Sequence, residues 1–216
     1  MRQWKRKSSP AQPPLKAKWR TNIDDHPIGL AWSPDGNILA VAGVSGPITL
    51  FNGADGAVQQ KLPGHAVDTM AISWHKNSRL LASVGQDGMV RLWDAETGTQ
   101  QSEMQGGASW VERVAFSPTG DWLVSAAGRK LRLWNSNGEL IREYPDANST
   151  ITDIKWRYDG KQFAISAYND EHGQRSRRRL AAEALILALL FETLMPNLMA
   201  RPDKRDCAEF SILARA

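Results

Sequence analysis

The chain has 216 residues, 42% of them hydrophobic, which is ordinary for a soluble protein and enough for one sizeable core. Its single cysteine, Cys207, excludes an intramolecular disulfide framework, and no Cys/His cluster has zinc-ligand spacing, so we expect neither a metal nor another cofactor. The net charge of +4 hides an acidic middle, with 12 Lys/Arg against 18 Asp/Glu over residues 21–171, so polyanion binding would depend on the basic ends.

The first 14 residues (MRQWKRKSSPAQPP) combine basic side chains with Ser, Pro and Gln and have no periodicity. We therefore predict a disordered basic arm over residues 1–14. No apolar run follows it, as a signal peptide would require, and we expect a cytoplasmic protein. Residues 15–20 are predicted to form a short strand, in which Trp19 is the large apolar residue.

Two sequence markers then recur about every 40 residues. The first is an aromatic residue just before a turn, at Trp32, Trp74, Phe116 and Trp156. The second is a Leu-aromatic pair at 50–51, 92–93 and 133–134. A period of this length with four short strands in each unit is typical of a β-propeller.

Alternating apolar and polar residues, separated by Gly-containing turns, predict the strands within each unit. They are 28–33, 38–43, 48–52 and 57–62 in unit 1; 69–74, 80–84, 89–93 and 99–104 in unit 2; 111–116, 122–126, 130–134 and 139–143 in unit 3; and 151–156 and 162–166 in unit 4. The corresponding blades are 22–62, 65–104, 107–143 and an incomplete 147–170. We therefore predict an all-β, open propeller segment over residues 15–170, with three four-stranded blades and half of a fourth. Its open end would expose a blade face and strand edges, from which we expect self-association or poor solubility.

The repeat ends near residue 171, and residues 171–216 form a tail with a different pattern. The run at 180–195 is rich in helix formers and is followed by Pro196, which predicts a helix there. The run is too short and, with Glu183 and Glu192, too charged for a membrane span. Two interpretations of the tail stay open: a cap over the open propeller, or the product of a frame change or fusion in a truncated member of its family.

Three motifs carry a resemblance to a known family. Unit 2 opens with Gly64-His65 and contains Leu92-Trp93-Asp94, and units 1 and 3 contain Ser-Pro-Asp/Thr-Gly turns. On these motifs, residues 15–170 resemble the WD-repeat β-propeller family. That resemblance implies a non-catalytic scaffold that binds protein partners through the loops at its strand ends.

The resemblance also implies a hydrogen-bonded staple in unit 2. Its members would be His65, Ser83, Asp87 and Trp93, with a buried Asp87 that accepts from the imidazole and the indole. Units 1 and 3 depart from this pattern, so we expect their blades to depend on apolar packing.

Candidate partner-binding residues are polar or aromatic loop residues without an evident packing role. They are Asp25, His26, Asp68, Trp110 and Ser149. Trp110 is the strongest candidate, because it lies just ahead of a predicted strand and aromatic anchors dominate interface energies.

Two other functions remain alternatives. An enzyme built on a propeller would need a nucleophile and base, and the trio His65, Ser83 and Asp87 invites that interpretation, but the aligned Trp completes a structural staple instead. Binding of nucleic acid or an acidic partner would use the N-terminal basic arm and the tail arginines, Arg175, Arg177, Arg178 and Arg179.

Overall fold

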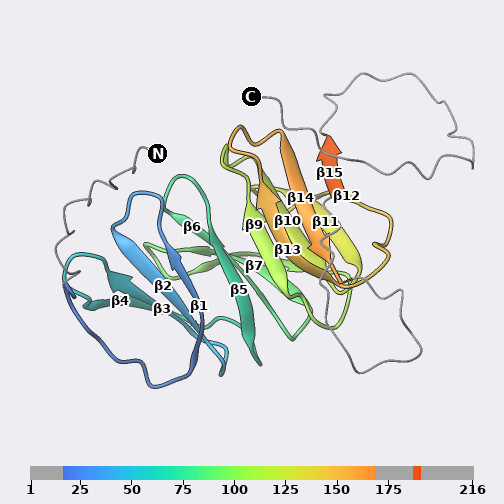
Figure 1. Cartoon of the computed structure of the whole chain (residues 1–216). Coiled ribbons are helices and arrows are strands. Elements are labelled where there is room, and N and C mark those ends of the chain that lie inside the picture. Colours follow the sequence, from blue (N-terminus) through green and yellow to red (C-terminus); the bar gives the residue numbers. More distant parts are fainter. Residues whose placement is uncertain (1–16, 169–186, 191–216) are drawn as a thin grey trace, which may run out of the picture.

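The computed structural model describes residues 17–168 and 187–190, which form four antiparallel sheets in succession along the chain (Figure 1). We call these sheets blades 1 to 4. Blade 1 contains β1 (Pro27–Trp32), β2 (Ile38–Gly43), β3 (Ile48–Asn52) and β4 (Val58–Leu62); blade 2 contains β5 (Thr69–Trp74), β6 (Leu80–Gly85), β7 (Met89–Asp94) and β8 (Gln100–Gln105); blade 3 contains β9 (Arg113–Phe116), β10 (Trp122–Ala127), β11 (Lys130–Asn135) and β12 (Leu140–Glu143); and blade 4 contains β13 (Ile151–Trp156), β14 (Gln162–Ala167) and β15 (Leu187–Leu190). Within every blade, strands that are consecutive in the chain are hydrogen-bonded neighbours.

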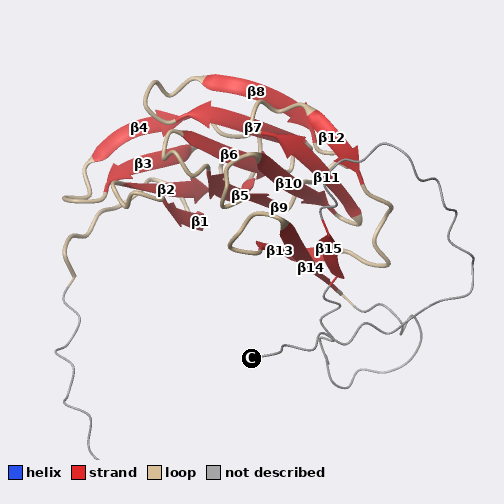
Figure 2. Cartoon of the chain, turned by 90° about the horizontal axis from the view of Figure 1, so that it is seen from above, coloured by secondary structure: helices blue, strands red, loops and turns tan. Residues whose placement is uncertain are grey.

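The blades lie side by side along an arc (Figure 2). The first strand of each blade lies on the inner side of this arc, and β4, β8 and β12 lie on its outer side. No helix of the described residues is long and apolar enough to cross a membrane.

A recurring turn after the first strand explains the Ser-Pro-x-Gly motifs. In blade 1 the Ser33 hydroxyl accepts from the Ile38 backbone N–H at 2.9 Å and donates to Asp35 at 2.6 Å. Gly36 has a φ of 73°, which a residue with a Cβ adopts only with strain. The Ser117 hydroxyl makes the corresponding bond in blade 3, so one local motif reverses the chain in both blades.

The apolar core of the protein lies between blades rather than within them. Three clusters of buried side chains separate the four blades: Ala40, Ala42, Ile48, Leu50 and Leu62 meet Trp74, Leu81 and Trp93; Val84, Val90, Leu92 and Met104 meet Val114, Phe116, Leu123 and Trp134; and Val124, Ala126, Leu131 and Leu133 meet Ile151, Ile154, Phe163 and Ile165. Each blade therefore needs a neighbour on both faces to bury its apolar residues, as in other repeat architectures.

The helix predicted for residues 180–195 is wrong where the structure describes that segment. Leu187–Leu190 is a strand, β15, antiparallel to β14. The free edge of β14 offers unpaired N–H and C=O groups, and pairing with it outweighs the helix propensity of a short Leu/Ala run. The rest of the predicted helix lies outside the described residues, as do the basic arm at 1–14 and Arg175, Arg177, Arg178 and Arg179.

The strand predicted for residues 15–20 is also wrong over its described part, because residues 17–20 pair with no strand. This segment is nevertheless attached to blade 1. The Trp19 indole N–H donates to the carbonyl of Gly53 at 3.0 Å, and the ring lies against Gly56. A strand requires a partner with free backbone groups, and the described residues offer none beside residues 17–20.

Candidate functional site

The loops that precede the first strands and the turns between the second and third strands lie along the same edge of the row of blades. Backbone hydrogen bonds tie them together there: Val44 N–H donates to the His26 carbonyl at 3.0 Å, and Gln86 N–H donates to the Asp68 carbonyl at 3.2 Å. Blade 3 is tied to blade 2 along the same edge, since Val111 N–H donates to the Gly85 carbonyl at 3.0 Å. We call this surface the loop edge, and Val44, Val67, Asp68 and Trp110 represent it.

Three large apolar side chains are exposed on the loop edge. Trp110 is 55% exposed, and Val44 and Val67 are also exposed. They come from blades 1, 2 and 3, so neighbouring repeats contribute to one surface. An exposed aromatic ring held by a rigid scaffold is the feature that most often anchors a protein interface.

Two carboxylates of the loop edge are held by local hydrogen bonds. Asp25 accepts from the Ser45 backbone N–H at 2.9 Å, the Ser45 hydroxyl at 3.1 Å and the His26 N–H at 2.7 Å. The Ser45 backbone bond is the main reason that the pKa of Asp25 is lowered. Asp68 accepts from the Gln86 side-chain amide at 2.6 Å. Asp25 therefore has a structural role that its sequence context did not reveal.

The remaining predicted residues differ in accessibility. His26 is exposed beside Asp25, as a partner-binding residue would be. Ser149 is only 4% exposed, so its hydroxyl cannot contact a partner without rearrangement of the loop. The prediction for Ser149 is therefore corrected, because a serine in a loop sequence gives no sign of whether the loop folds over it.

One buried acceptor beside Trp110 was not identified from the sequence. The Glu112 side-chain oxygen Oε2 is buried and has no hydrogen-bond partner in the part of the chain that the structure describes. An unpaired buried carboxylate oxygen is costly and needs an explanation. Only the fold shows that this oxygen is buried.

The staple residues of blade 2 form a continuous buried hydrogen-bond chain. The Trp93 indole N–H donates to the Ser83 oxygen at 2.8 Å, and Ser83 lies 2.8 Å from His65 Nε2. His65 Nδ1 lies 2.8 Å from Asp87 Oδ1. The same Nδ1 lies 2.6 Å from Nη1 of Arg91, so it contacts both an acceptor, Asp87, and a donor, Arg91. The expected indole-to-Asp87 bond is wrong: the indole is bonded to Ser83.

Arg91 is a member of this network that the sequence analysis missed. Its guanidinium donates to Asp87 at 2.6 Å and to Glu103 on the neighbouring strand at 2.9 Å. The corresponding residue of blade 3, Arg132, pairs with Glu143 in the same way. The recurrence of an Arg two residues before the Trp was the available signal.

The environment fixes the protonation of the buried pair. Burial lowers the pKa of His65, and this outweighs the opposite effect of its hydrogen bond to Asp87. Burial by itself raises the pKa of Asp87, but hydrogen bonds from Arg91 and His65 outweigh it and bring the pKa to about 2. The pair is therefore a neutral imidazole and a carboxylate, shielded from solvent.

Blades 1 and 3 do not depend on apolar packing alone, contrary to expectation. In blade 3 the Trp134 indole N–H donates to the buried Ser125 hydroxyl at 2.9 Å, which keeps half of the staple. In blade 1 Asp25 and Ser45 provide a polar tie between the entry loop and the turn after β2. The buried indole of blade 3 thus finds an acceptor, whereas the tie in blade 1 is exposed to solvent.

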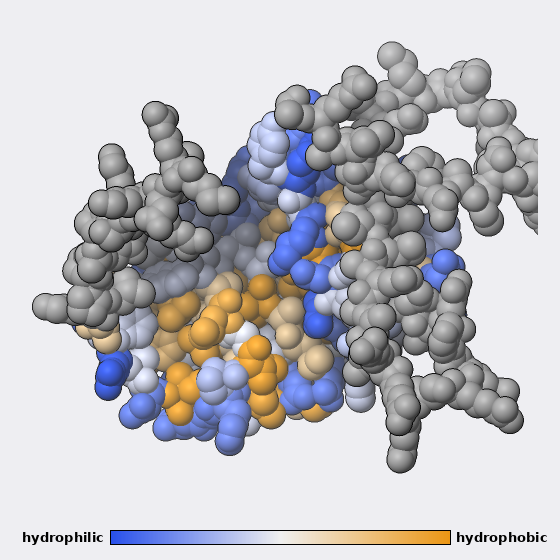
Figure 3. Space-filling model, in the orientation of Figure 1, coloured by the Kyte–Doolittle hydropathy of each residue, from blue (hydrophilic) through white to orange (hydrophobic). Residues whose placement is uncertain are grey.

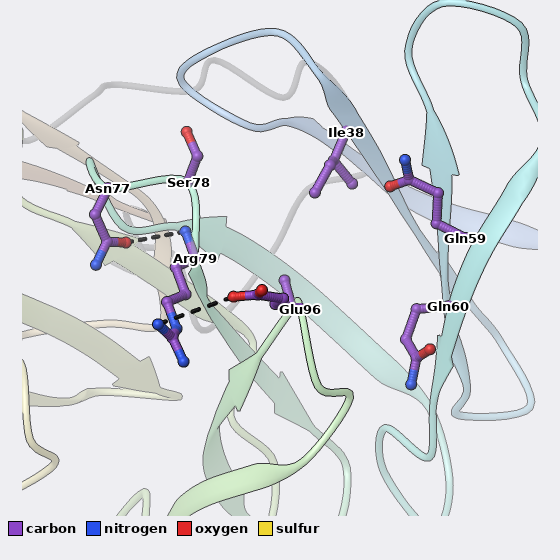
Figure 4. Close-up of a pocket in the computed structure, with 8 residues that line it drawn as sticks. Ile38, Gln59, Gln60, Asn77, Ser78, Arg79 and Glu96 are labelled. Atoms are coloured by element: carbon purple, nitrogen blue, oxygen red, sulfur yellow. Dashed lines mark hydrogen bonds and ion pairs between the residues drawn. The ribbon is translucent and has the colours of Figure 1, made fainter.

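A groove of about 660 Å³ lies between blades 1 and 2, on the edge opposite the loop edge (Figure 4). It is open to solvent, and its lining residues are Ile38, Gln59, Gln60, Asn77, Ser78, Arg79, Ala95 and Glu96. Arg79 donates to Asp94 at 2.8 Å and lies 3.9 Å from Glu96, so its charge is already neutralised. The groove offers amide and hydroxyl groups to a ligand, without a nucleophile activated by a base.

Across residues 17–168 and 187–190, no three His, Cys, Asp or Glu side chains are grouped closely enough to hold a metal ion.

The comparisons with known proteins agree with this geometry. A family model described as "WD domain, G-beta repeat" matches residues 56–94 and 98–135. No curated protein matches the chain.

Several solved structures share the fold at low sequence identity. A computationally designed protein, Ika4, has a TM-score of 0.67 and 18% identity, over 83% of this chain and 100% of that protein. U3-55K has a TM-score of 0.64 and 16% identity, over 69% of this chain and 48% of that one. The structure of RRP9 WD40 repeats has a TM-score of 0.63 and 16% identity, over 69% and 47% respectively. This chain thus spans about half the length of U3-55K and of the RRP9 structure.

The prediction of an all-β, open WD-repeat propeller is confirmed by the four sheets and by these neighbours. The register of the Leu-Trp pairs, the polar staple of blade 2 and the family match over two consecutive segments identify the same architecture. Residues 56–94 and 98–135 thus carry WD40 repeats, and the described fold is that of a partial WD-repeat propeller.

Proposed function

We propose that this protein is a non-catalytic scaffold that binds a protein partner through the loop edge. WD40 repeats in general suggest a protein-interaction scaffold. The observation that carries the proposal is Trp110, whose ring is 55% exposed on the loop edge, where three blades bring their loops together. A rigid sheet architecture beneath the ring lowers the entropic cost of binding.

The chemistry of the loop edge favours a partner segment with both apolar and basic side chains. Trp110 and Val67 offer apolar contact, and Asp68 offers a carboxylate. Complementary charges of this kind improve specificity and association rate more than affinity.

Contacts within the staple support a structural and not a catalytic role for the trio of His65, Ser83 and Asp87. A nucleophilic serine must reach a substrate, but Ser83 is fully buried and its oxygen accepts from Trp93. Asp87 is neutralised by Arg91 as well as bonded to His65. This is the basis on which we propose that the protein is not an enzyme.

Two further parts of the proposal rest on sequence alone. The basic arm and Arg175, Arg177, Arg178 and Arg179 lie outside the described residues, and binding of a polyanion by them stays a prediction that a salt titration would test. A cytoplasmic location is also a proposal, and imaging of the tagged full chain would test it.

The experiment compares two exposed aromatic residues, one on the loop edge and one on the opposite edge of the blades. The full chain is immobilised and captured proteins are quantified for the unmodified protein, Trp110→Ala and Tyr158→Ala. Tyr158 is the matched control, because it is exposed on the turn after β13, away from the loop edge. We expect Trp110→Ala to lose, by about tenfold or more, partners that Tyr158→Ala retains.

Two results would contradict the proposal. Equal capture by both variants would exclude Trp110 as the anchor, and retention of every partner by a second variant, Asp68→Ala/Val67→Ser, would exclude the loop edge. Loss of capture only on removal of the basic arm would assign the interaction to the arm instead.

A further inference from the structure

The inner-strand residues of blade 1 are exposed at positions that are buried or half-buried in the other blades. Trp32 is 51% exposed, whereas the corresponding Trp74 and Phe116 are 8% and 7% exposed. Leu30 is 68% exposed, whereas its counterpart in blade 4, Ile154, is 4% exposed. In blades 2 to 4 these side chains pack on the preceding blade, and no described residues form a blade that precedes blade 1.

The apolar surface is visible on the inner side of the arc. Figure 3 shows hydrophobic side chains gathered over β1 and β5 on the face that is turned to the viewer. β1 contributes Ile28, Leu30 and Trp32, all exposed. We call Leu30 and Trp32, with the side of blade 1 that carries them, the free face of blade 1.

A repeated hydrogen bond shows what the free face is built to contact. The Trp74 indole N–H donates to the carbonyl of Ala31 on the preceding blade at 2.9 Å. The Trp156 indole N–H donates to Ala115 of its preceding blade at 3.0 Å. Within the described part of the chain, the Trp32 indole N–H donates to no oxygen. The missing acceptor is a main-chain carbonyl one residue before the final aromatic residue of another inner strand.

Blade 4 carries that acceptor position on a face that no described blade covers. Lys155 stands immediately before Trp156, as Ala31 stands before Trp32 and Ala115 before Phe116. Its side chain is exposed and pairs with Asp153 at 3.4 Å.

The second strand of blade 4 also matches the faces that are covered elsewhere. In blades 1 and 2 this strand presents small residues to the next blade, such as Ala40 and Ala82. The residue of blade 4 at that position is Ala164, which pairs with Lys155 across β13 and β14 just as Ala40 pairs with Ala31. A small residue there leaves room for the side chains of a following blade.

The segment at 17–20 adds a third match. The outer strand of each blade contacts the turn before the outer strand of the next blade: Gln60 lies against Gly98, and Ser102 lies against Gly138. Trp19 lies against Gly56, the corresponding glycine of blade 1. Residues 17–20 therefore occupy the place of the outer strand of a blade that would precede blade 1.

We propose that the free face of blade 1 binds blade 4 of a second copy of this chain, head to tail, with residues 17–20 beside that blade as its outer strand. The contact repeats the one that already joins blades within the chain. A contact between two different faces generates a ring when its rotation closes. Two copies suffice here, because one copy spans about half of the WD40 chains of U3-55K and RRP9.

The test uses the full chain and three variants in analytical ultracentrifugation over a concentration series. We expect the unmodified protein to have twice the 24.0 kDa mass of the chain. Leu30→Asp places a charge on the free face of blade 1, and Ala164→Arg places a bulky charge on the opposite face of blade 4. Each variant should weaken association at least about tenfold, because the interface would bury an unpaired charge. Trp110→Ala is the control, since it removes an aromatic ring of similar exposure from the loop edge, and it should remain dimeric.

Mixing the two interface variants distinguishes head-to-tail binding from the alternatives. In the mixture, one of the two contacts joins undamaged faces, so association should recover in part. An interface between two blade 1 faces would leave Ala164→Arg fully dimeric, which would overturn the proposal. A monomeric unmodified protein would also overturn it and would indicate that the free face is covered by the same chain or by another protein. Circular dichroism of each variant must retain the β-sheet spectrum, and for a variant that fails this check Leu30→Ser or Ala164→Gln takes its place.

Discussion

Replacing Ser83 with Ala removes the central link of the blade 2 staple. The Ser83 oxygen accepts from the Trp93 indole at 2.8 Å and is hydrogen-bonded to His65 Nε2 at 2.8 Å. The substitution leaves the Trp93 indole N–H and His65 Nε2 without a partner. Trp93 and His65 are both buried, so neither group reaches water. At roughly 1–3 kcal/mol for each orphaned group, we expect the free energy of unfolding to fall by about 2–6 kcal/mol.

Ser125→Ala in blade 3 is the matched control. Ser125 is buried to the same degree, and it accepts from the Trp134 indole at 2.9 Å, but no histidine continues the chain there. One orphaned group instead of two predicts a loss of about 1–3 kcal/mol. Urea unfolding, followed by tryptophan fluorescence at fixed protein concentration, measures both values.

The comparison tests the staple and not merely the burial of a serine. If both substitutions reduce the free energy of unfolding equally, the His65 bond contributes nothing and the assignment of the hydrogen-bond chain is refuted. A larger loss for Ser125→Ala than for Ser83→Ala would refute it more strongly, because the order would be reversed.

Two further predictions concern the same network. Asp87→Ala should lower the free energy of unfolding by about 1–3 kcal/mol, because it removes the partner of His65 Nδ1. Ser45→Ala removes only an exposed bond to Asp25 and should change the free energy of unfolding by less than about 0.5 kcal/mol. Equal losses in urea unfolding would contradict this prediction. The lowered pKa of His65 means that its contribution to stability is complete above its usual value of 6.5 and is lost as the pH falls below it, with Asp87 adding a second loss as the pH falls from 3.8 towards about 2. Stability measured against pH should therefore decrease below about pH 6.5 in the unmodified protein and lose this first step in His65→Gln, and a step of unchanged size in the variant would exclude His65 as its source.

The repeat architecture could be predicted from the sequence because each unit specifies its own local structure. The Ser-Pro-x-Gly turns close by hydrogen bonds within a few residues, as Ser33 does with Asp35 and Ile38. The alternation in each strand directs apolar side chains to the faces that pack on neighbouring blades. The staple residues His65, Ser83 and Trp93 were predicted from the resemblance to the WD-repeat family.

Other features depended on which segments the fold brings together. The Leu187–Leu190 run has no β-specific pattern, and its strand exists because β14 offers a free edge. The role of Asp25 depends on the approach of Ser45, twenty residues away, and the burial of Ser149 depends on how its loop folds. None of these is a property of the local sequence.

For this protein, the sequence by itself determined the strands, the turns and the blade period, because all three arise from contacts within one repeat of about 40 residues. Only the tertiary structure decided which surfaces are free. Trp32 and Trp74 occupy the same place in the repeat, yet one is half exposed and the other is buried. The difference lies entirely in the neighbour: β5 has blade 1 beside it, and no described blade precedes β1.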